Sequence, residues 1–275
     1  MYAYDFEYDG KMLSSFGFII CSFGGGQGVG KTETGSEITF ITSPIQDGKR
    51  YVTGGTKYDK CLSTSFQICK DPSFFNRSEQ KEMEISSDEF RTLSRWLNRR
   101  KFLWFRANDW CDPDKDRPWV RASFTLSRID IDNTTYGIEL KMDTDSPFCY
   151  GDEVVKTFEF ANADDTVLFI DNNDEIGETY PELTITCGAA GTLTLSDDRT
   201  GCECTVENCV SGEVIHFSGD TKIVDSSSAS HDIANDFNYD YFRFGNTHDD
   251  RENIITASMP CTVEMKYRPI RKDTL

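Results

Sequence analysis

Short alternations of apolar and polar residues run through most of this chain, and they constrain its fold more than any other feature. Val, Ile, Thr, Phe and Tyr recur in runs bounded by Gly, Asp and Asn, which is typical of strands. The connections are short, which favours antiparallel pairing over crossovers through helices. The clearest predicted strands are Glu37–Thr42, Arg121–Asp130, Tyr136–Met142, Thr192–Leu195, Glu213–Phe217, Thr221–Val224, Tyr239–Phe244 and Thr262–Arg268. We therefore expect a mostly β fold.

One segment has helical periodicity instead. The pattern Ser86-x-x-Glu89 is a capping box, which satisfies free amides at the start of a helix. Phe90, Leu93 and Leu97 then follow at helical spacing, with Trp96 beside them. We predict a helix over residues 86–101, about 16 residues long, followed by a strand over residues 102–105. The second half of the chain has no comparable pattern.

Charge is distributed unevenly along the 275 residues. The net charge is −18, from 29 basic and 47 acidic side chains. Residues 1–150 carry 20 basic and 22 acidic side chains, whereas residues 151–275 carry 9 and 25. This asymmetry predicts two domains, over residues 1–155 and 156–275, with a boundary in the stretch that contains Pro147 and Gly151. The acidic second half argues against nucleic acid as a partner, because phosphates are bound by Lys and Arg.

The start of the chain and its cysteines indicate the compartment of synthesis. Met1 is not followed by a basic region and an apolar stretch, so we expect no secretory signal and synthesis in a cytoplasm. The apolar run Phe16–Cys21 is too short to span a membrane. Ten cysteines are scattered without a framework spacing, and in a reducing compartment such residues are mostly small buried hydrophobes.

The stretch Gly25–Thr32 has the spelling of a phosphate-binding P-loop, G-x-x-x-x-G-K-T, and Val167–Asp171 resembles the strand and Asp of a Walker B motif. A P-loop must open into a helix, whose first amides hold the phosphate. Residues 33–44 instead contain a Gly, β-branched alternation and a Pro, which favour a strand. We therefore expect no nucleotide site. Gly25–Thr32 is predicted to be a mobile loop between two strands that orders against an adjacent subunit or another protein of its assembly.

The sequence contains two groups of potential metal ligands. Cys202, Cys204, Cys209 and His216 could supply four zinc ligands, although zinc sites usually use C-x₂-C pairs and a C-x-C pair on a strand suits a core equally well. Residues 112–116 carry Asp at alternate positions like a calcium loop, but Arg117 stands where Gly is needed. We expect an acidic loop there, and we predict no metal and no cofactor.

Catalytic motifs are missing, and one aromatic pattern has two interpretations. The chain has three histidines and no nucleophile elbow or H-E-x-x-H helix, so we predict that it is not an enzyme, with no catalytic or cofactor-binding residues. Phe237, Tyr239 and Tyr241 could form a face that stacks on sugars. The register shifts at Phe242, so part of this set is predicted to be core.

The order of short motifs resembles the distal tail (Dit) proteins of long-tailed phages. The beginning of the chain has the family's D-G turn and its strand beginning with Phe-Gly, and residues 75–105 have its helix and aromatic strand. The second half has its N-x-x-x-G-E-x-I run and its last strand. The segments that carry the resemblance are Phe6–Lys11, Phe16–Ile20, Tyr136–Leu140, Asp145–Tyr150, Val206–Asp220, Arg251–Ile255 and Thr262–Arg268.

The resemblance implies two β-sandwich domains, the first with one helix and the second galectin-like. It implies a structural virion protein, with the first domain of six copies forming a ring. The ring would connect the tail tube to tail-tip or baseplate proteins and to host-attachment proteins, without contact to nucleic acid or membrane. The sequence departs from the family at Arg251, where Gly is usual, and in the glycine-rich Gly25–Thr32 loop.

Three rival functions remain open at this point. A carbohydrate-binding module would bind glycans through Tyr239 or Tyr241, although no galectin sugar signature is recognisable. A P-loop NTPase would lose ATP binding with Lys31→Ala. A tube protein would polymerise into long tubes instead of closing a ring.

Overall fold

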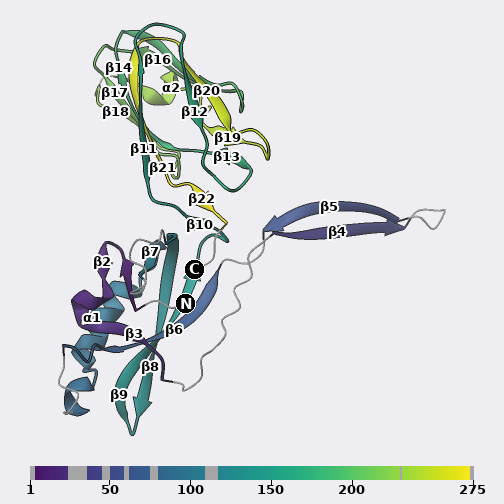
Figure 1. Ribbon diagram of the computed structural model, residues 1–275. Helices are drawn as coiled ribbons and strands as arrows, with labels where there is room; N and C mark the ends of the chain where they lie inside the picture. The colour runs from purple at the N-terminus through teal and green to yellow at the C-terminus, as the bar shows by residue number, and fades with distance from the viewer. Residues whose placement is uncertain are drawn as a thin grey trace. The chain divides into compact units, whose positions relative to one another are not determined.

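The structure is a computed structural model that describes residues 4–23, 36–44, 50–58, 62–74, 80–108, 117–229 and 231–272 (Figure 1). The chain divides into two compact units. The first consists of Met1–Gly151 together with Arg271–Leu275, and the second of Asp152–Ile270. All strand pairs whose register is described are antiparallel. The prediction of a mostly β, antiparallel fold is confirmed.

The first unit is built on one seven-stranded sheet in the order β2-β1-β7-β8-β9-β6-β3. A separate pair, β4 and β5, forms its own two-stranded sheet, and so do β10 and β22, of which β22 begins at the last residue of the second unit. The strands are β1 (Asp5–Tyr8), β2 (Lys11–Met12), β3 (Phe18–Cys21), β4 (Ser36–Pro44), β5 (Arg50–Tyr58), β6 (Ser63–Lys70), β7 (Leu103–Asn108), β8 (Val120–Ile131), β9 (Thr134–Thr144), β10 (Cys149–Tyr150) and β22 (Ile270–Arg271). Two 3-10 helices, η1 (Leu13–Phe16) and η2 (Gln80–Met83), accompany them.

The seven-stranded sheet curls so that its own strands face each other. Strands β1 and β6 are four positions apart, which would separate them by about 19 Å in a flat sheet. The rings of Phe6 on β1 and Phe66 on β6 nevertheless lie 5.7 Å apart, centroid to centroid. Phe6 also packs against Phe105 and Phe124. The two facing layers of this unit therefore come from one sheet wrapped around an aromatic core.

Helix α1 (Ser87–Leu97) packs on this core. Both bonds of the predicted capping box form: the Glu89 amide donates to Ser86 Oγ, and the Ser86 amide donates to Glu89 Oε2. Leu93, Trp96 and Leu97 are buried, and Trp96 Nε1 donates to the Tyr8 carbonyl at 3.0 Å. The predicted end at residue 101 is wrong, because Asn98 has ψ 81 and leaves the helical conformation.

The second unit has two main antiparallel sheets, as a β-sandwich requires. A five-stranded sheet has the order β11-β21-β14-β17-β18, a four-stranded sheet has the order β12-β20-β15-β16, and β13 pairs with β19. The strands are β11 (Val154–Phe160), β12 (Asp165–Ile170), β13 (Gly177–Thr179), β14 (Glu182–Cys187), β15 (Gly191–Asp197), β16 (Cys202–Cys209), β17 (Val214–Phe217), β18 (Val224–Ser226), β19 (Phe244–Asn246), β20 (Glu252–Ala257) and β21 (Cys261–Tyr267).

The core of the sandwich is formed by the inward-facing positions of both sheets. Leu183 and Ile185 on β14 alternate with outward polar residues, and so do Leu193 and Leu195 on β15. The predicted last strand, residues 262–268, exists as β21, which pairs with β11 and β14 inside the second unit. In the described part of this unit, a single short helix, α2 (Ile233–Asp236), interrupts the β structure.

Two predicted strands are wrong in the structure. The prediction for residues 221–224 fails because Lys222 has φ +56, so the strand starts only at Val224. The prediction for residues 239–244 fails because Tyr239 has φ +62 and only Phe244 enters a strand. A left-handed residue at the start of a run interrupts the extended backbone that a strand needs. No helix among the described residues is long and apolar enough to cross a membrane.

Candidate functional site

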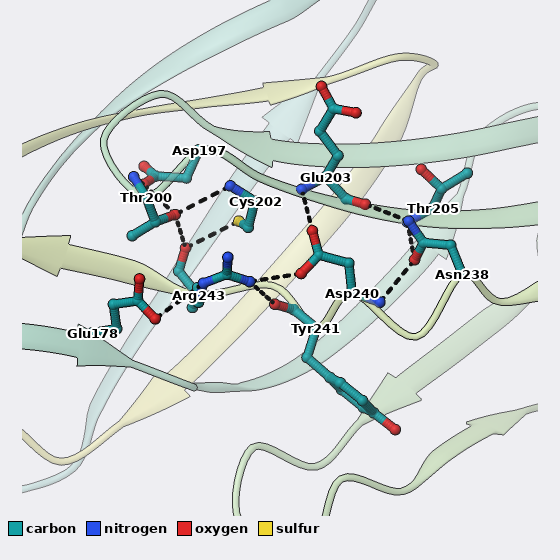
Figure 2. A network of polar contacts seen from close by, with 10 residues as sticks. All are labelled: Glu178, Asp197, Thr200, Cys202, Glu203, Thr205, Asn238, Asp240, Tyr241 and Arg243. Carbon is teal, nitrogen blue, oxygen red and sulfur yellow. Dashed lines mark hydrogen bonds and ion pairs between the residues drawn. The ribbon is translucent and has the colours of Figure 1, made fainter.

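The segment 237–243 lies in a network of polar contacts that includes residues singled out from the sequence (Figure 2). Arg243 lies at its centre. Its Nη1 donates to Asp240 Oδ1 at 2.6 Å and to the Tyr241 carbonyl at 3.3 Å, and its Nε lies 3.1 Å from Glu178 Oε2. Its own carbonyl accepts from the Thr200 hydroxyl. Arg243 therefore fixes the segment instead of extending toward a ligand.

Side chains of this segment cover the outer edge of β16. The Thr205 amide donates to Asn238 Oδ1 at 3.2 Å, and Asn238 Nδ2 donates to the Glu203 carbonyl at 2.6 Å. The Glu203 amide donates to Asp240 Oδ2 at 2.9 Å. Two side chains thus occupy backbone groups that a further strand would use. Figure 2 shows both of them turned toward β16.

The electrostatics of Asp240 agree with this anchoring role. Burial alone would raise the pKa of its carboxyl group, but the amide of Glu203 and the guanidinium of Arg243 together lower that pKa below its ordinary value. The carboxylate therefore stays ionised, with both of its oxygens already hydrogen-bonded. Such a group has no free capacity for proton transfer.

The three aromatic residues considered as a sugar-stacking face do not form one. Phe237 is buried and packs edge-on against Phe217 and Tyr241. The Tyr241 hydroxyl donates to the Lys222 carbonyl at 2.7 Å, and Lys222 Nζ lies over the Tyr180 ring. Tyr239 alone is well exposed, at 62%. Because the left-handed residue Tyr239 breaks the strand, the alternation that predicted a common face is lost.

The possible zinc ligands lie on different faces. Cys202, Cys204 and Cys209 are buried in the core of the sandwich, as the core interpretation of the C-x-C pair predicted. His216 lies on the outward face of β17, where its Nε2 is 3.1 Å from Glu182 Oε1. Among the described residues, no group of three or more His, Cys, Asp or Glu could hold a metal ion. The Asp-rich residues 112–116 lie outside the described residues.

The P-loop-like and Walker B-like motifs differ in what the structure describes of them. Gly25–Thr32 lies outside the described residues, and the chain resumes at Ser36 in strand β4, where a P-loop would continue as a helix. Asp171 is fully buried: its carboxylate accepts from Asn173 Nδ2 and Asn246 Nδ2, each at 2.7 Å. Burial raises the pKa of this carboxyl group. Asp171 therefore belongs to a buried amide network and is not presented to a metal-bound phosphate.

A buried ion pair that the sequence interpretation missed lies beside α2. His231 Nδ1 is 2.5 Å from Glu213 Oε1, and both side chains are almost completely buried. The Ser226 hydroxyl donates to the same Glu213 oxygen, and the Val210 amide donates to its other oxygen. The Ser226 hydroxyl contacts the carboxylate and not the imidazole. A catalytic serine would instead donate its proton to the imidazole as the base, so this arrangement is not that of a nucleophile with its base. Sequence patterns give little indication of this pair, because a single Glu before an apolar run is common.

A hollow of about 210 Å³ lies in the first unit beside the start of α1. It is lined by the apolar residues Phe16, Phe18 and Leu93 and by the polar residues Asp88, Glu89 and Thr92. The Glu89 carboxylate already lies 2.8 Å from Lys70 Nζ and accepts from Ser86, and the Thr92 hydroxyl donates to the Asp88 carbonyl. Glu89 and Thr92 therefore already have partners within the protein, which disfavours a ligand site here.

Comparisons with known proteins agree with an assembly role. Residues 1–146 match the family described as "Phage tail protein N-terminal domain", and residues 148–267 match "Phage tail C-terminal domain". No curated protein matches the chain significantly. Among solved structures, the chain is similar to the SPP1 Dit protein (gp 19.1), described as a paradigm of the hub adsorption apparatus in phages that infect Gram-positive bacteria. The identity is 14% and the TM-score 0.61, over 96% of this chain and 98% of that one.

Proposed function

The chain belongs to the phage tail protein family, and from this premise we propose that it is a subunit of the distal tail hub. A structural role in the tail follows from the family itself. The distal position is proposed because the two-unit fold is similar to SPP1 Dit over nearly the whole of both chains. This full-length correspondence of the fold is the observation that carries the proposal.

We propose further that six copies form a closed ring through the first unit. Residues 1–150 are close to neutral, with 20 basic and 22 acidic side chains, so copies can pack without strong repulsion. Residues 151–275 carry 9 basic and 25 acidic side chains, which suits an outward, solvated position. The ring would join the tail tube on one side to tail-tip, baseplate and receptor-binding proteins on the other.

This role requires no chemistry from the chain. The buried Glu213–His231 pair lacks a nucleophile, and the Arg243 guanidinium is paired with Asp240 and Glu178. We therefore propose a non-enzymatic protein without a cofactor, made in the host cytoplasm and incorporated into the virion. The glycine-rich Gly25–Thr32 stretch is proposed to contact a neighbouring subunit or tail protein and not a phosphate.

Labelling of intact virions tests the proposed position. Antibody fragments raised against the chain and conjugated to gold should mark one site, at the end of the tail far from the capsid, in electron micrographs. Label along the whole tail would indicate a tube protein, and label at the capsid end would contradict a distal hub. Capsids without tails serve as the control for non-specific binding.

A further inference from the structure

Strand β12 has an open edge. It is the outermost strand of the four-stranded sheet and pairs with β20 on one side only. The Asp171 amide donates to the Arg251 carbonyl at 2.9 Å, so the odd-numbered residues of β12 exchange hydrogen bonds with β20. The amides and carbonyls of Thr166, Leu168 and Ile170 therefore point away from the sheet. Within the described parts of the chain, these groups have no partner.

The same stretch exposes large aliphatic side chains. Leu168 is 58% exposed and Ile170 is 54% exposed. Leu168 stands directly opposite Ile254 of β20, which is 43% exposed, in a position where cross-strand side chains lie close together. These three side chains form an apolar strip beside the free backbone groups. An edge of this kind pairs readily with another strand.

The other outer edges of the sandwich are protected. The edge of β16 is occupied by Asn238 and Asp240 (Figure 2). The outer strand β11 carries the exposed charges Lys156 and Glu159, and β18 is only three residues long. Charges, short strands and side-chain covers are the usual ways in which sheets prevent unwanted pairing. On β12 the three residues whose backbone groups point outward, Thr166, Leu168 and Ile170, are uncharged and uncovered by described side chains, which sets this edge apart from the others.

Charged groups around the strip are mostly acidic. Asp164 and Asp165 precede or begin the strand, and Glu252 stands opposite Ile170. None of these three carboxylates forms an ion pair among the described residues. The nearby Arg199 is already paired with Asp250 at 2.5 Å, and Arg251 donates to the Asn173 carbonyl. A segment that binds here would therefore gain from basic residues beside its apolar centre.

We propose that β12 is a docking edge for an extended apolar segment, flanked by Lys or Arg, of another tail protein. The segment would add a fifth strand to the sheet through the three amides and three carbonyls of Thr166, Leu168 and Ile170. Alternate side chains would cover Leu168, Ile170 and Ile254. A second copy of this unit fits poorly, because residues 151–275 carry 25 acidic and 9 basic side chains. The inference does not depend on how many copies form the ring.

Amide hydrogen exchange with a defined peptide tests this edge. The probe is a synthetic nine-residue peptide with five alternating Thr and Val residues between two Lys pairs, added to the full-length protein. Exchange at the amides of Thr166, Leu168 and Ile170 should slow at least about tenfold, because they gain partners. Exchange at Val167 and Phe169, which already bond to β20, should change little.

Matched controls separate strand addition from general attraction. The same peptide with N-methylated Thr residues, or with Glu in place of Lys, should give no protection. Leu168→Lys should abolish the effect, whereas Ile223→Lys, at a residue that is similarly exposed at 54%, should preserve it. Equal protection by the N-methylated peptide, or none with the Lys-flanked peptide at millimolar concentration, would overturn the proposal. The proposal would also be overturned if these three amides exchanged slowly in the free protein because two copies pair through this edge. A correct ring mass alongside any of these results would leave the hub role intact.

Discussion

The amide of Ile20 donates a hydrogen bond of 2.9 Å to the carbonyl of Tyr4, and this bond joins β3, at one end of the sheet order, to the residue before β1, the second strand from the other end. Ile20 lies on β3, the last strand of the order, and Tyr4 directly precedes β1. The Asp71 amide donates to the Gly17 carbonyl, so the residues of β3 that bond to β6 are Ile19 and Cys21. The Ile20 amide is therefore free to close the sheet around its aromatic core.

Replacing this donor should loosen the first unit. Ile20→Pro removes the amide that donates to Tyr4 while leaving the hydrogen bonds of β3 to β6 in place. We expect the free energy of unfolding to fall by about 3 kcal/mol. Ile20→Val keeps the amide and should cost only about 1 kcal/mol. Denaturant unfolding of both variants checks the difference. Equal losses would mean that the closing bond contributes nothing beyond side-chain packing.

The buried Glu213–His231 pair predicts a large effect from a single histidine. His231→Ala leaves the Glu213 carboxylate buried without its cation, so the second unit should lose about 3 kcal/mol of unfolding free energy. His216→Ala is the matched control, because that imidazole pairs with Glu182 at the surface. It should change stability little. A similar loss in both variants, measured by denaturant unfolding, would contradict the importance of burial.

The same pair predicts a window of pH in which it stabilises the fold. Burial alone would lower the pKa of His231, but Glu213 outweighs it and raises that pKa above 6.5. Burial alone would raise the pKa of Glu213, but Ser226 and His231 lower it below 4.5. The contribution of the Glu213–His231 pair to the free energy of unfolding is therefore complete between pH 4.5 and 6.5. It is lost as pH rises through the pKa of folded His231, or falls through that of folded Glu213.

Unfolding of the wild type and of a Glu213→Gln/His231→Gln double variant across this range checks the prediction. The difference in stability between the two proteins should be greatest inside the window and shrink on both sides. A difference that does not vary with pH would show that the pair does not titrate with folding.

The side-chain cover on β16 predicts a change in association as well as in stability. Asn238→Ala removes the acceptor of the Thr205 amide and the donor to the Glu203 carbonyl, at a cost of about 1 kcal/mol. The uncovered edge should also promote association at high concentration. Asn235→Ala is the control, since its side-chain amide donates to Asp232, directly before α2, and not to β16. Light scattering against concentration should rise for Asn238→Ala alone. No rise would show that the edge is protected by other means.

Local patterns predicted the regular elements of this chain well. The capping box at Ser86 and Glu89 identified the start of α1 because its two hydrogen bonds join residues only three apart in sequence. The strand after the glycine-rich stretch was also predicted correctly from β-branched alternation and Pro44. The end of the helix was not, since Asn98 leaves the helix although the basic residues after it favour its continuation.

Features that depend on tertiary contacts could not be found in the sequence. The left-handed conformation of Tyr239 is stable in the fold because Asn238 and Asp240 hold the backbone of β16 on either side of it. The Glu213–His231 pair joins residues 18 apart, with strands β17 and β18 between them, so no local pattern places the two side chains together. The curl of the first sheet depends on ring contacts between strands that are distant in both sequence and sheet order.

The central claim is that copies of this chain close a ring of six, and the mass of the assembled particle tests it most directly. Multi-angle light scattering of the full-length protein, alone and co-expressed with the adjacent tail-tube and tail-tip proteins, gives that mass. We expect a discrete particle with six copies of the 31.3 kDa chain and six-fold symmetry in electron micrographs. A chain that stays monomeric in every mixture, or that grows into open-ended tubes, would contradict the account.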